Sequence, residues 1–145
     1  METRSEVENR LSEFGIKPSL QRIAILAYLM EHFTHPSVDT IFRDLHAVRP
    51  TLSKRMLYNT LKLLTEKGVI QTLNIDDDQR FDIDISRHAH FKCKHCDSVY
   101  DIPIKDSTSF KIKDPVDFVV MECQVYYKGY CKQCRDVFAQ NVVLF

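Results

Sequence analysis

Residues 80–100, RFDIDISRHAHFKCKHCDSVY, bring two sets of metal-binding residue types into one short run. The first set is the C-x-x-C pair of Cys93 and Cys96, and a second such pair, Cys131 and Cys134, lies beyond residues 97–130. Four thiolates suit tetrahedral zinc in a closed structural site, and soft sulfur ligands favour zinc or iron–sulfur centres over magnesium or calcium. The spacing therefore predicts one shared metal site. The alternative is four unrelated thiols, or two redox pairs.

The second set consists of nitrogen and oxygen donors. His88 and His90 are one residue apart in a segment that we expect to be extended, and alternate side chains of a strand point to the same face. Both imidazoles can therefore converge on one ion. Asp82 precedes them and Asp101 follows. Such a set suits iron(II), manganese(II) or zinc, whereas the alternative is a polar surface turn with two solvated histidines.

Composition limits the class of protein. A chain of 145 residues with 44% hydrophobic and 28% charged residues forms one domain or two small ones with a soluble surface. The formal net charge is zero, which argues against a strongly basic nucleic-acid coat. Residues 1–75 carry 10 Lys/Arg and 8 Asp/Glu, hence +2, and residues 76–145 carry 10 and 12, hence −2. The mild positive bias of the first half is compatible with DNA binding.

No apolar run reaches transmembrane length, and the first ten residues, METRSEVENR, lack the apolar region of a signal peptide. We therefore expect a cytoplasmic protein that makes no membrane contact. In that compartment, C-x-x-C pairs bind metal more often than they form disulfides.

The first half has the pattern of a winged helix. Helical periodicity covers residues 4–14, 20–33, 38–48 and 54–67, and Ser19, Ser37 and Ser53 stand at N-cap positions of the last three helices. The third and fourth helices, joined by a short turn, predict a helix-turn-helix. Residues 69–75 and 80–85 then flank an acidic turn and predict a hairpin.

The fourth predicted helix has two different faces. Leu57, Leu61 and Leu64 form an apolar stripe that we expect to enter the core. Arginine and asparagine on the opposite face can read guanine and adenine edges, and lysine and tyrosine can hold phosphates. The candidate DNA-binding residues are Lys54, Arg55, Tyr58, Asn59 and Lys62. The alternative is a solvated helix face, and the acidic turn 76–78 would be repelled by phosphate.

The second half predicts a small α/β domain. Residues 91–104 indicate a short strand pair around the first cysteine pair, residues 118–130 a long strand, and the second cysteine pair a helical turn. Cys123 falls in the long strand, where a buried thiol is expected. About 60 residues with few helices are marginally stable alone, so zinc or a partner subunit is expected to stabilise them. The predicted fold is α+β, with domains at 1–84 and 85–145.

This order of motifs resembles the ferric uptake regulator (Fur) family of metal-responsive repressors over nearly the whole chain. The residues that carry the resemblance are Gln21-Arg22, His35-Pro36-Ser37, Leu57-Tyr58-Asn59 with Leu61, Glu66-Lys67-Gly68-Val69, Arg80-Phe81-Asp82, His88-x-His90, Cys93-x-x-Cys96, Asp101, and Gly129-Tyr130-Cys131 with Cys134.

The resemblance implies a homodimer with an N-terminal winged helix and a C-terminal dimerisation domain. It implies structural zinc at the four paired cysteines and a repressor that binds a double-stranded DNA operator with two-fold symmetry. It also implies a regulatory site for Fe2+ or Mn2+, with Zn2+ possible. The implied regulatory ligands are His35, Asp82, His88, His90 and Asp101.

Both carboxylates of that set are aspartates, Asp82 and Asp101, as in the peroxide-sensing branch of the family, whereas iron-uptake regulators more often have glutamate at the later position. In that branch, bound iron(II) reacts with peroxide and a ligand histidine is oxidised. The alternative function is a sensor of iron or zinc availability without peroxide chemistry. An enzyme is not expected, because a zinc hydrolase needs an open coordination position and a nearby base.

The chain departs from the family pattern at several positions. Asp97 stands where family members often have glycine after the first cysteine pair. Met121-Glu122-Cys123 stands at a later family metal site that is often rich in histidine. A further metal site at Glu122 and Cys123 is the alternative to a buried thiol, and there Cys123 could ligate a softer metal such as zinc.

Overall fold

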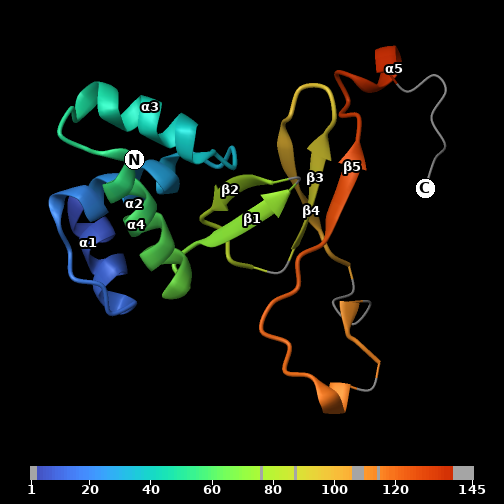
Figure 1. The fold of residues 1–145 in the computed structure, drawn as a ribbon, viewed down its shortest axis with the longest axis horizontal. Helices are drawn as coiled ribbons and strands as arrows, with labels where there is room; N and C mark the ends of the chain where they lie inside the picture. The colour runs from blue at the N-terminus through green and yellow to red at the C-terminus, as the bar shows by residue number, and fades with distance from the viewer. Residues whose placement is uncertain (1–2, 76, 87, 106–109, 114, 139–145) are drawn as a thin grey trace. The chain divides into compact units, whose positions relative to one another are not determined.

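The computed structural model describes residues 3–75, 77–86, 88–105, 110–113 and 115–138. The chain divides into two compact units, Met1–Ile85 and Ser86–Phe145. Helices dominate the first unit and a small sheet dominates the second, so the α+β fold is confirmed (Figure 1). Within the described residues, no helix has both the length and the apolar character needed to span a membrane.

Four helices open the first unit: α1 (Arg4–Glu13), α2 (Leu20–Glu31), α3 (Val38–Val48) and α4 (Lys54–Glu66). The predicted serine caps are confirmed: Ser19, Ser37 and Ser53 each accept a hydrogen bond from a backbone N–H of the first turn. Gly15 and Gly68 follow α1 and α4 with φ of 73° and 79°, a conformation that glycine adopts without steric cost.

The core of the first unit lies among these helices. Leu57, Leu61 and Leu64 of α4 are buried, as their stripe predicts. In α2, Ile25, Leu26 and Leu29 are all buried. A helix packed by neighbours on several sides has no single apolar stripe. Burial of these side chains is the main favourable contribution to folding of the unit.

A two-stranded hairpin completes the first unit and corresponds to the predicted wing. Strands β1 (Gln71–Ile75) and β2 (Asp78–Asp82) pair in antiparallel register, with Gln71 opposite Asp82. Asp77 has a φ of 63° at the turn, and aspartate tolerates this left-handed conformation better than most residues. Asp76, the first residue of the predicted acidic turn, lies outside the described residues. Helices followed by this hairpin make a winged helix.

The second unit is built on a three-stranded sheet. Strands β3 (His88–Cys93), β4 (Val99–Pro103) and β5 (Tyr126–Gly129) have the order β4-β3-β5. β4 is antiparallel to β3 and β5 is parallel to it. The short helices η2 (Pro115–Asp117) and α5 (Arg135–Phe138) flank β5 in the sequence, and α5 corresponds to the predicted helical turn.

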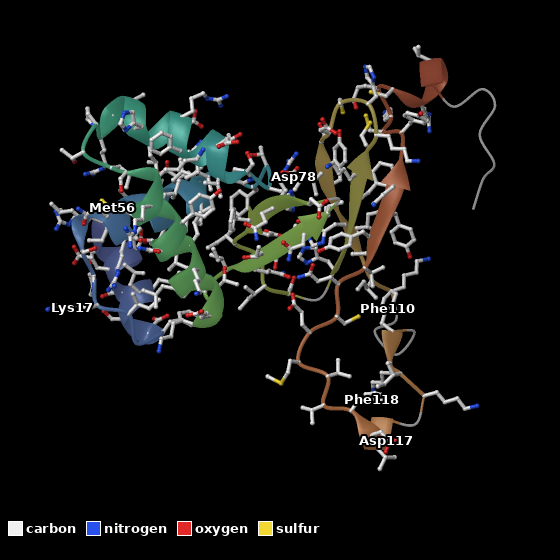
Figure 2. The ribbon with its side chains drawn as sticks, in the orientation of Figure 1. Lys17, Met56, Asp78, Phe110, Asp117 and Phe118 are labelled. Atoms are coloured by element: carbon white, nitrogen blue, oxygen red, sulfur yellow. The ribbon has the colours of Figure 1, made fainter. Side chains whose placement is uncertain are left out.

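The long strand predicted for residues 118–130 was mostly wrong. Of this run, Tyr126–Gly129 forms β5, whereas residues 118–125 belong to no strand. The residue types favour extended backbone, but a strand also needs a partner for its hydrogen bonds. Cys123 is correspondingly exposed rather than a buried strand thiol. Figure 2 shows Asp117 at the end of η2 and Phe118 just after it, away from the sheet of their unit.

Candidate metal centres and nucleic-acid interface

The four paired cysteines come together in the second unit. Cys93 ends β3, Cys96 lies in the turn before β4, and Cys131 and Cys134 lie between β5 and α5. The parallel register places Cys93 beside Gly129, so the second pair arrives next to the first. The four Sγ atoms lie within 4.8 Å of one another.

The sulfur geometry fits zinc. Cys96 Sγ and Cys131 Sγ are 3.7 Å apart. A tetrahedral zinc with Zn–S bonds of about 2.3 Å has sulfur–sulfur edges of about 3.8 Å. Cys93, Cys131 and Cys134 are buried, with exposed fractions of 0%, 6% and 7%. The four cysteines therefore form one cluster that could hold a metal ion, with Cys96 on its exposed side.

The charge balance of this cluster also favours a cation. Burial raises the pKa of the Cys93 thiol, but backbone N–H donors of Cys96, Cys131 and His95 outweigh burial and bring the pKa down to about 6. Burial and the neighbouring thiols raise the pKa of Cys134 to about 12. One thiolate thus opposes ionisation of the next. A zinc ion at the centre would supply the positive charge that all four thiolates need.

Two polar side chains lie beside this cluster, and the sequence did not indicate either of them. The Ser98 hydroxyl lies 3.2 Å from Cys96 Sγ. A side-chain hydrogen bond to Cys131 raises the pKa of the Tyr100 hydroxyl, which fits a phenol that donates to a thiolate. Both residues sit just after the first C-x-x-C, on or next to β4. Polar groups next to metal ligands orient the ligands and tune their charge.

A second group of candidate ligands lies on strands β3 and β4. His88 and His90 project from the same face of β3, as their spacing predicts, with ring centroids 4.4 Å apart. Asp101 faces His90 across the β3–β4 ladder. Asp101 Oδ1 lies 3.1 Å from His88 Nε2 and 3.3 Å from His90 Nε2. One carboxylate oxygen thus lies close to two imidazole nitrogens. Imidazole and carboxylate groups are both common metal ligands.

The remaining two candidate ligands pair inside the first unit. His35 Nε2 lies 3.2 Å from Asp82 Oδ2, and both side chains are nearly fully buried, at 3% and 4% exposure. The other oxygen of Asp82 accepts the backbone N–H of Asp84 at 2.9 Å, which fixes the orientation of the carboxylate. His35 adopts a φ of 54°, uncommon for a residue other than glycine. A buried imidazole–carboxylate pair of this kind is a candidate ligand pair for a divalent cation.

The candidate DNA-contacting residues of α4 all lie exposed, as predicted. The residues in question are Lys54, Arg55, Tyr58, Asn59 and Lys62. Two of the cations already have local partners: Lys54 Nζ lies 2.5 Å from Asp39 Oδ1, and Lys62 Nζ lies 4.0 Å from Glu66 Oε1. Both pairs are at the surface, where such pairs contribute little and exchange readily for a phosphate.

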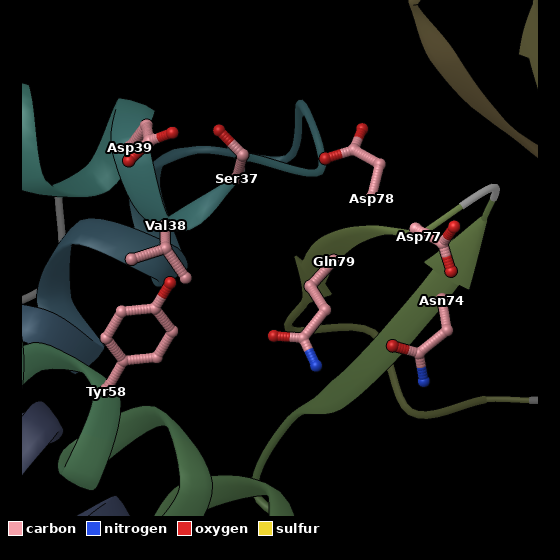
Figure 3. A pocket seen from close by; sticks show the side chains of 8 residues that line it. All are labelled: Ser37, Val38, Asp39, Tyr58, Asn74, Asp77, Asp78 and Gln79. Atoms are coloured by element: carbon pink, nitrogen blue, oxygen red, sulfur yellow. The ribbon is translucent and has the colours of Figure 1, made fainter.

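A pocket of about 690 Å³ lies beside α4 in the first unit (Figure 3). It is lined by Ser37, Val38 and Asp39 at the start of α3, by Tyr58 of α4, and by Asn74, Asp77, Asp78 and Gln79 of the hairpin. Asp39, Asp77 and Asp78 place three carboxylates around it. This charge opposes a DNA phosphate, which is the effect expected of the acidic turn. The outer face of α4 is therefore the better candidate for contact with DNA.

The chain is similar to known proteins of one family. A family model described as the ferric uptake regulator family matches residues 13–128. The peroxide-responsive repressor PerR of Staphylococcus aureus, strain Mu50, is 32% identical over 129 residues, which cover 87% of each chain.

Solved structures of the same kind share the fold. The ferric uptake regulator Fur of Helicobacter pylori, described with three functional metal binding sites, has a TM-score of 0.68 at 20% identity, covering 92% of this chain and 95% of its own. PerR from Streptococcus pyogenes has a TM-score of 0.50 at 27% identity, covering 92% and 94%. The chain therefore belongs to the ferric uptake regulator family of metal-responsive regulators.

Proposed function

We propose that this protein is a homodimeric repressor whose DNA binding requires a regulatory iron(II) or manganese(II) ion, and whose iron form responds to peroxide. The observation that carries the proposal is the donor chemistry of the two histidine–aspartate groups. His35 with Asp82, and His88 and His90 with Asp101, offer imidazole and carboxylate ligands without a thiol. Harder nitrogen and oxygen ligands suit exchangeable iron(II) or manganese(II), whereas the four thiolates suit permanent zinc.

The regulatory step follows from the distribution of the ligands along the chain. His35 and Asp82 belong to the DNA-binding unit, and His88, His90 and Asp101 belong to the second unit. We propose that all five hold one ion. An ion shared by both units stabilises the arrangement in which all ligands are engaged, and its differential affinity shifts the population toward a DNA-competent state. Loss of a ligand releases that constraint and the operator.

The homodimer is supported by the surface of the second unit. Val116, Phe118, Val119 and Met121 are exposed by 90%, 68%, 87% and 89%. Such a run of exposed apolar side chains marks an interaction surface in a small domain. A second copy of the chain would cover this surface and place two α4 helices on a two-fold-related operator.

The peroxide response requires chemistry at one of the ligand rings. Bound iron(II) supplies the electron transfer that activates peroxide, and manganese(II) does so far less readily. We propose that the ring of His35 or His88 then gains one oxygen atom at a carbon, while the peroxide O–O bond breaks and the second oxygen leaves as water. The ring loses two electrons and peroxide gains two. The three imidazoles and two carboxylates would hold the ion, and iron(II) bound there would supply the electrons that activate peroxide.

A DNA-binding assay tests the metal requirement. The protein would first be prepared with zinc as its only metal. Manganese(II) would then be added, and two-fold-symmetric sites would be selected from a random pool of DNA duplexes. The selected duplex should then shift with manganese(II) or iron(II) and stay free without them. Equal binding in the absence of a regulatory metal would contradict the proposal. Binding restored by zinc or iron alone, with no peroxide response, would instead indicate a sensor of metal availability.

A further inference from the structure

Arg80 connects the wing to the candidate ligand His35 within the first unit. Its side chain comes from the middle of β2 and is 16% exposed. Arg80 Nε donates to Asp78 Oδ2 at 2.6 Å, and Arg80 Nη1 donates to the backbone carbonyl of His35 at 3.2 Å. The guanidinium therefore holds the first residue of β2 and the backbone of a candidate metal ligand at the same time.

The backbone of His35 needs such support. A φ of 54° lies in the left-handed region, where the Cβ atom of a non-glycine residue crowds the following backbone. Conformations of this kind persist where surrounding contacts fix them, and they cluster at functional sites. The next residues are also fixed to β2, because Phe81 N–H donates to Pro36 O at 3.1 Å and Ser37 forms an antiparallel bridge with Arg80.

These contacts place the two ligands of the first unit on a common support. Asp82 is the last residue of β2, and residues 35–37 run along the same strand. The distance of 3.2 Å between His35 Nε2 and Asp82 Oδ2 therefore depends on how firmly the His35 backbone is held against β2. Arg80 makes a side-chain hydrogen bond to that backbone. A planar guanidinium can satisfy a carboxylate and a carbonyl together, whereas a lysine ammonium lacks this fixed fork.

We infer that Arg80 is a positioning residue for the regulatory ion: it holds His35 in its left-handed conformation and ties this ligand to the wing through Asp78. The inference rests on the proposed regulatory role of His35. Residues that orient a metal ligand typically change metal affinity by about 10–100-fold when they are replaced. Arg80 itself donates only and cannot ligate the ion.

The test uses the full-length, zinc-loaded protein and titrates manganese(II), which avoids oxidation. Arg80→Gln should weaken manganese(II) binding by about 10–100-fold at unchanged zinc content, and Arg80→Lys should weaken it less. Arg43→Ala is the matched control, because Arg43 is 74% exposed and pairs with Asp44 on α3. It should bind manganese(II) like the parent protein. If Arg80→Gln does not fold, the manganese(II) affinity of Arg80→Lys is compared with that of Arg43→Ala, and equal affinities would contradict the inference.

A double-mutant cycle with His35→Ala separates positioning from general stabilisation. Because Arg80 acts through His35, Arg80→Gln should add little to the loss caused by His35→Ala. If Arg80→Gln lowers manganese(II) affinity by the same factor in the parent protein and in the His35→Ala variant, the inference is overturned. It is also overturned if Arg80→Gln binds manganese(II) like the parent protein while His35→Ala binds it weakly. Parent-like binding by His35→Ala would instead overturn the proposed regulatory site itself, so the two failures are distinguishable.

Discussion

Asp101 stands directly opposite His90 in the antiparallel β3–β4 ladder, with 3.3 Å between the carboxylate Oδ1 and the imidazole Nε2. The same oxygen lies 3.1 Å from His88 Nε2. Cross-strand neighbours at one register position have fixed side-chain separation, so this part of the site is set by strand pairing. The ladder thus places three candidate ligand groups together.

Replacing Asp101 by asparagine tests this group. The change keeps the size of the side chain and removes the negative charge that faces both imidazoles. Manganese(II) affinity should fall by at least about tenfold, and DNA binding should need correspondingly more metal. Metal titration of the zinc-loaded protein measures the effect. Asp117→Asn, a change in η2 outside the ladder, is the control and should leave affinity unchanged. Equal affinities of the two variants would remove Asp101 from the site.

Replacing Cys96 by serine tests the structural zinc. Cys96 Sγ lies 3.7 Å from Cys131 Sγ, and one missing thiolate leaves the tetrahedron incomplete. The variant should lose its zinc and unfold at lower temperature, because metal binding is coupled to folding. Zinc content and thermal unfolding report the result. Cys123→Ser, at the exposed cysteine outside the cluster, should keep one zinc per chain. Full zinc in Cys96→Ser would contradict the assignment.

Replacing Asp97 by glycine should stabilise the zinc-loaded protein. Asp97 has a φ of 60° in the turn after Cys96, and its N–H donates to Cys93 O at 3.1 Å. Glycine adopts this conformation without steric cost, and the expected gain is below about 1 kcal/mol in free energy of unfolding, because aspartate tolerates it better than most residues. Asp97→Ala, which keeps the Cβ atom, should give no such gain. Thermal unfolding at equal zinc occupancy compares the three proteins, and a less stable Asp97→Gly would contradict the strain argument.

Replacing Arg55 and Asn59 by alanine tests the exposed face of α4. Loss of each base-reading side chain should cost about 1–3 kcal/mol of operator binding and relax specificity at its position. Lys62→Ala should instead weaken binding to all sequences and lower the salt dependence. Lys17→Ala removes a charge from the loop between α1 and α2 and serves as the control. Quantitative shifts over a series of operator variants measure both effects. Unchanged affinity of the Arg55→Ala, Asn59→Ala double variant would move the interface elsewhere.

Local signals account for what the sequence predicted well. Serine caps before apolar periodic runs place α2, α3 and α4, because the cap satisfies N–H groups that the first helical turn leaves open. The two C-x-x-C pairs predict the thiolate cluster because each pair forms one compact turn that brings its two sulfur atoms together. Alternation along β3 likewise places His88 and His90 on one face.

Long-range relationships were not predictable in this way. The parallel pairing of β5 with β3 joins segments more than 30 residues apart, and residue type does not reveal it. The same gap explains the error at residues 118–125, whose strand-forming residues have no partner strand among the described residues of their unit. The left-handed backbone of His35 and the contacts of Arg80 also depend on tertiary packing. For His35, the local signal was the following proline, which disfavours a continued helix. The contacts of Arg80 had no such signal.

The most direct test of the account is mass analysis of the iron(II) form after exposure to stoichiometric peroxide, alongside its DNA binding. We predict that the peptide containing His35 or His88 gains one oxygen atom and that operator binding is lost in proportion. The manganese(II) form should remain unmodified and bound. Loss of DNA binding with both histidines intact and the zinc-site cysteines oxidised would contradict the account.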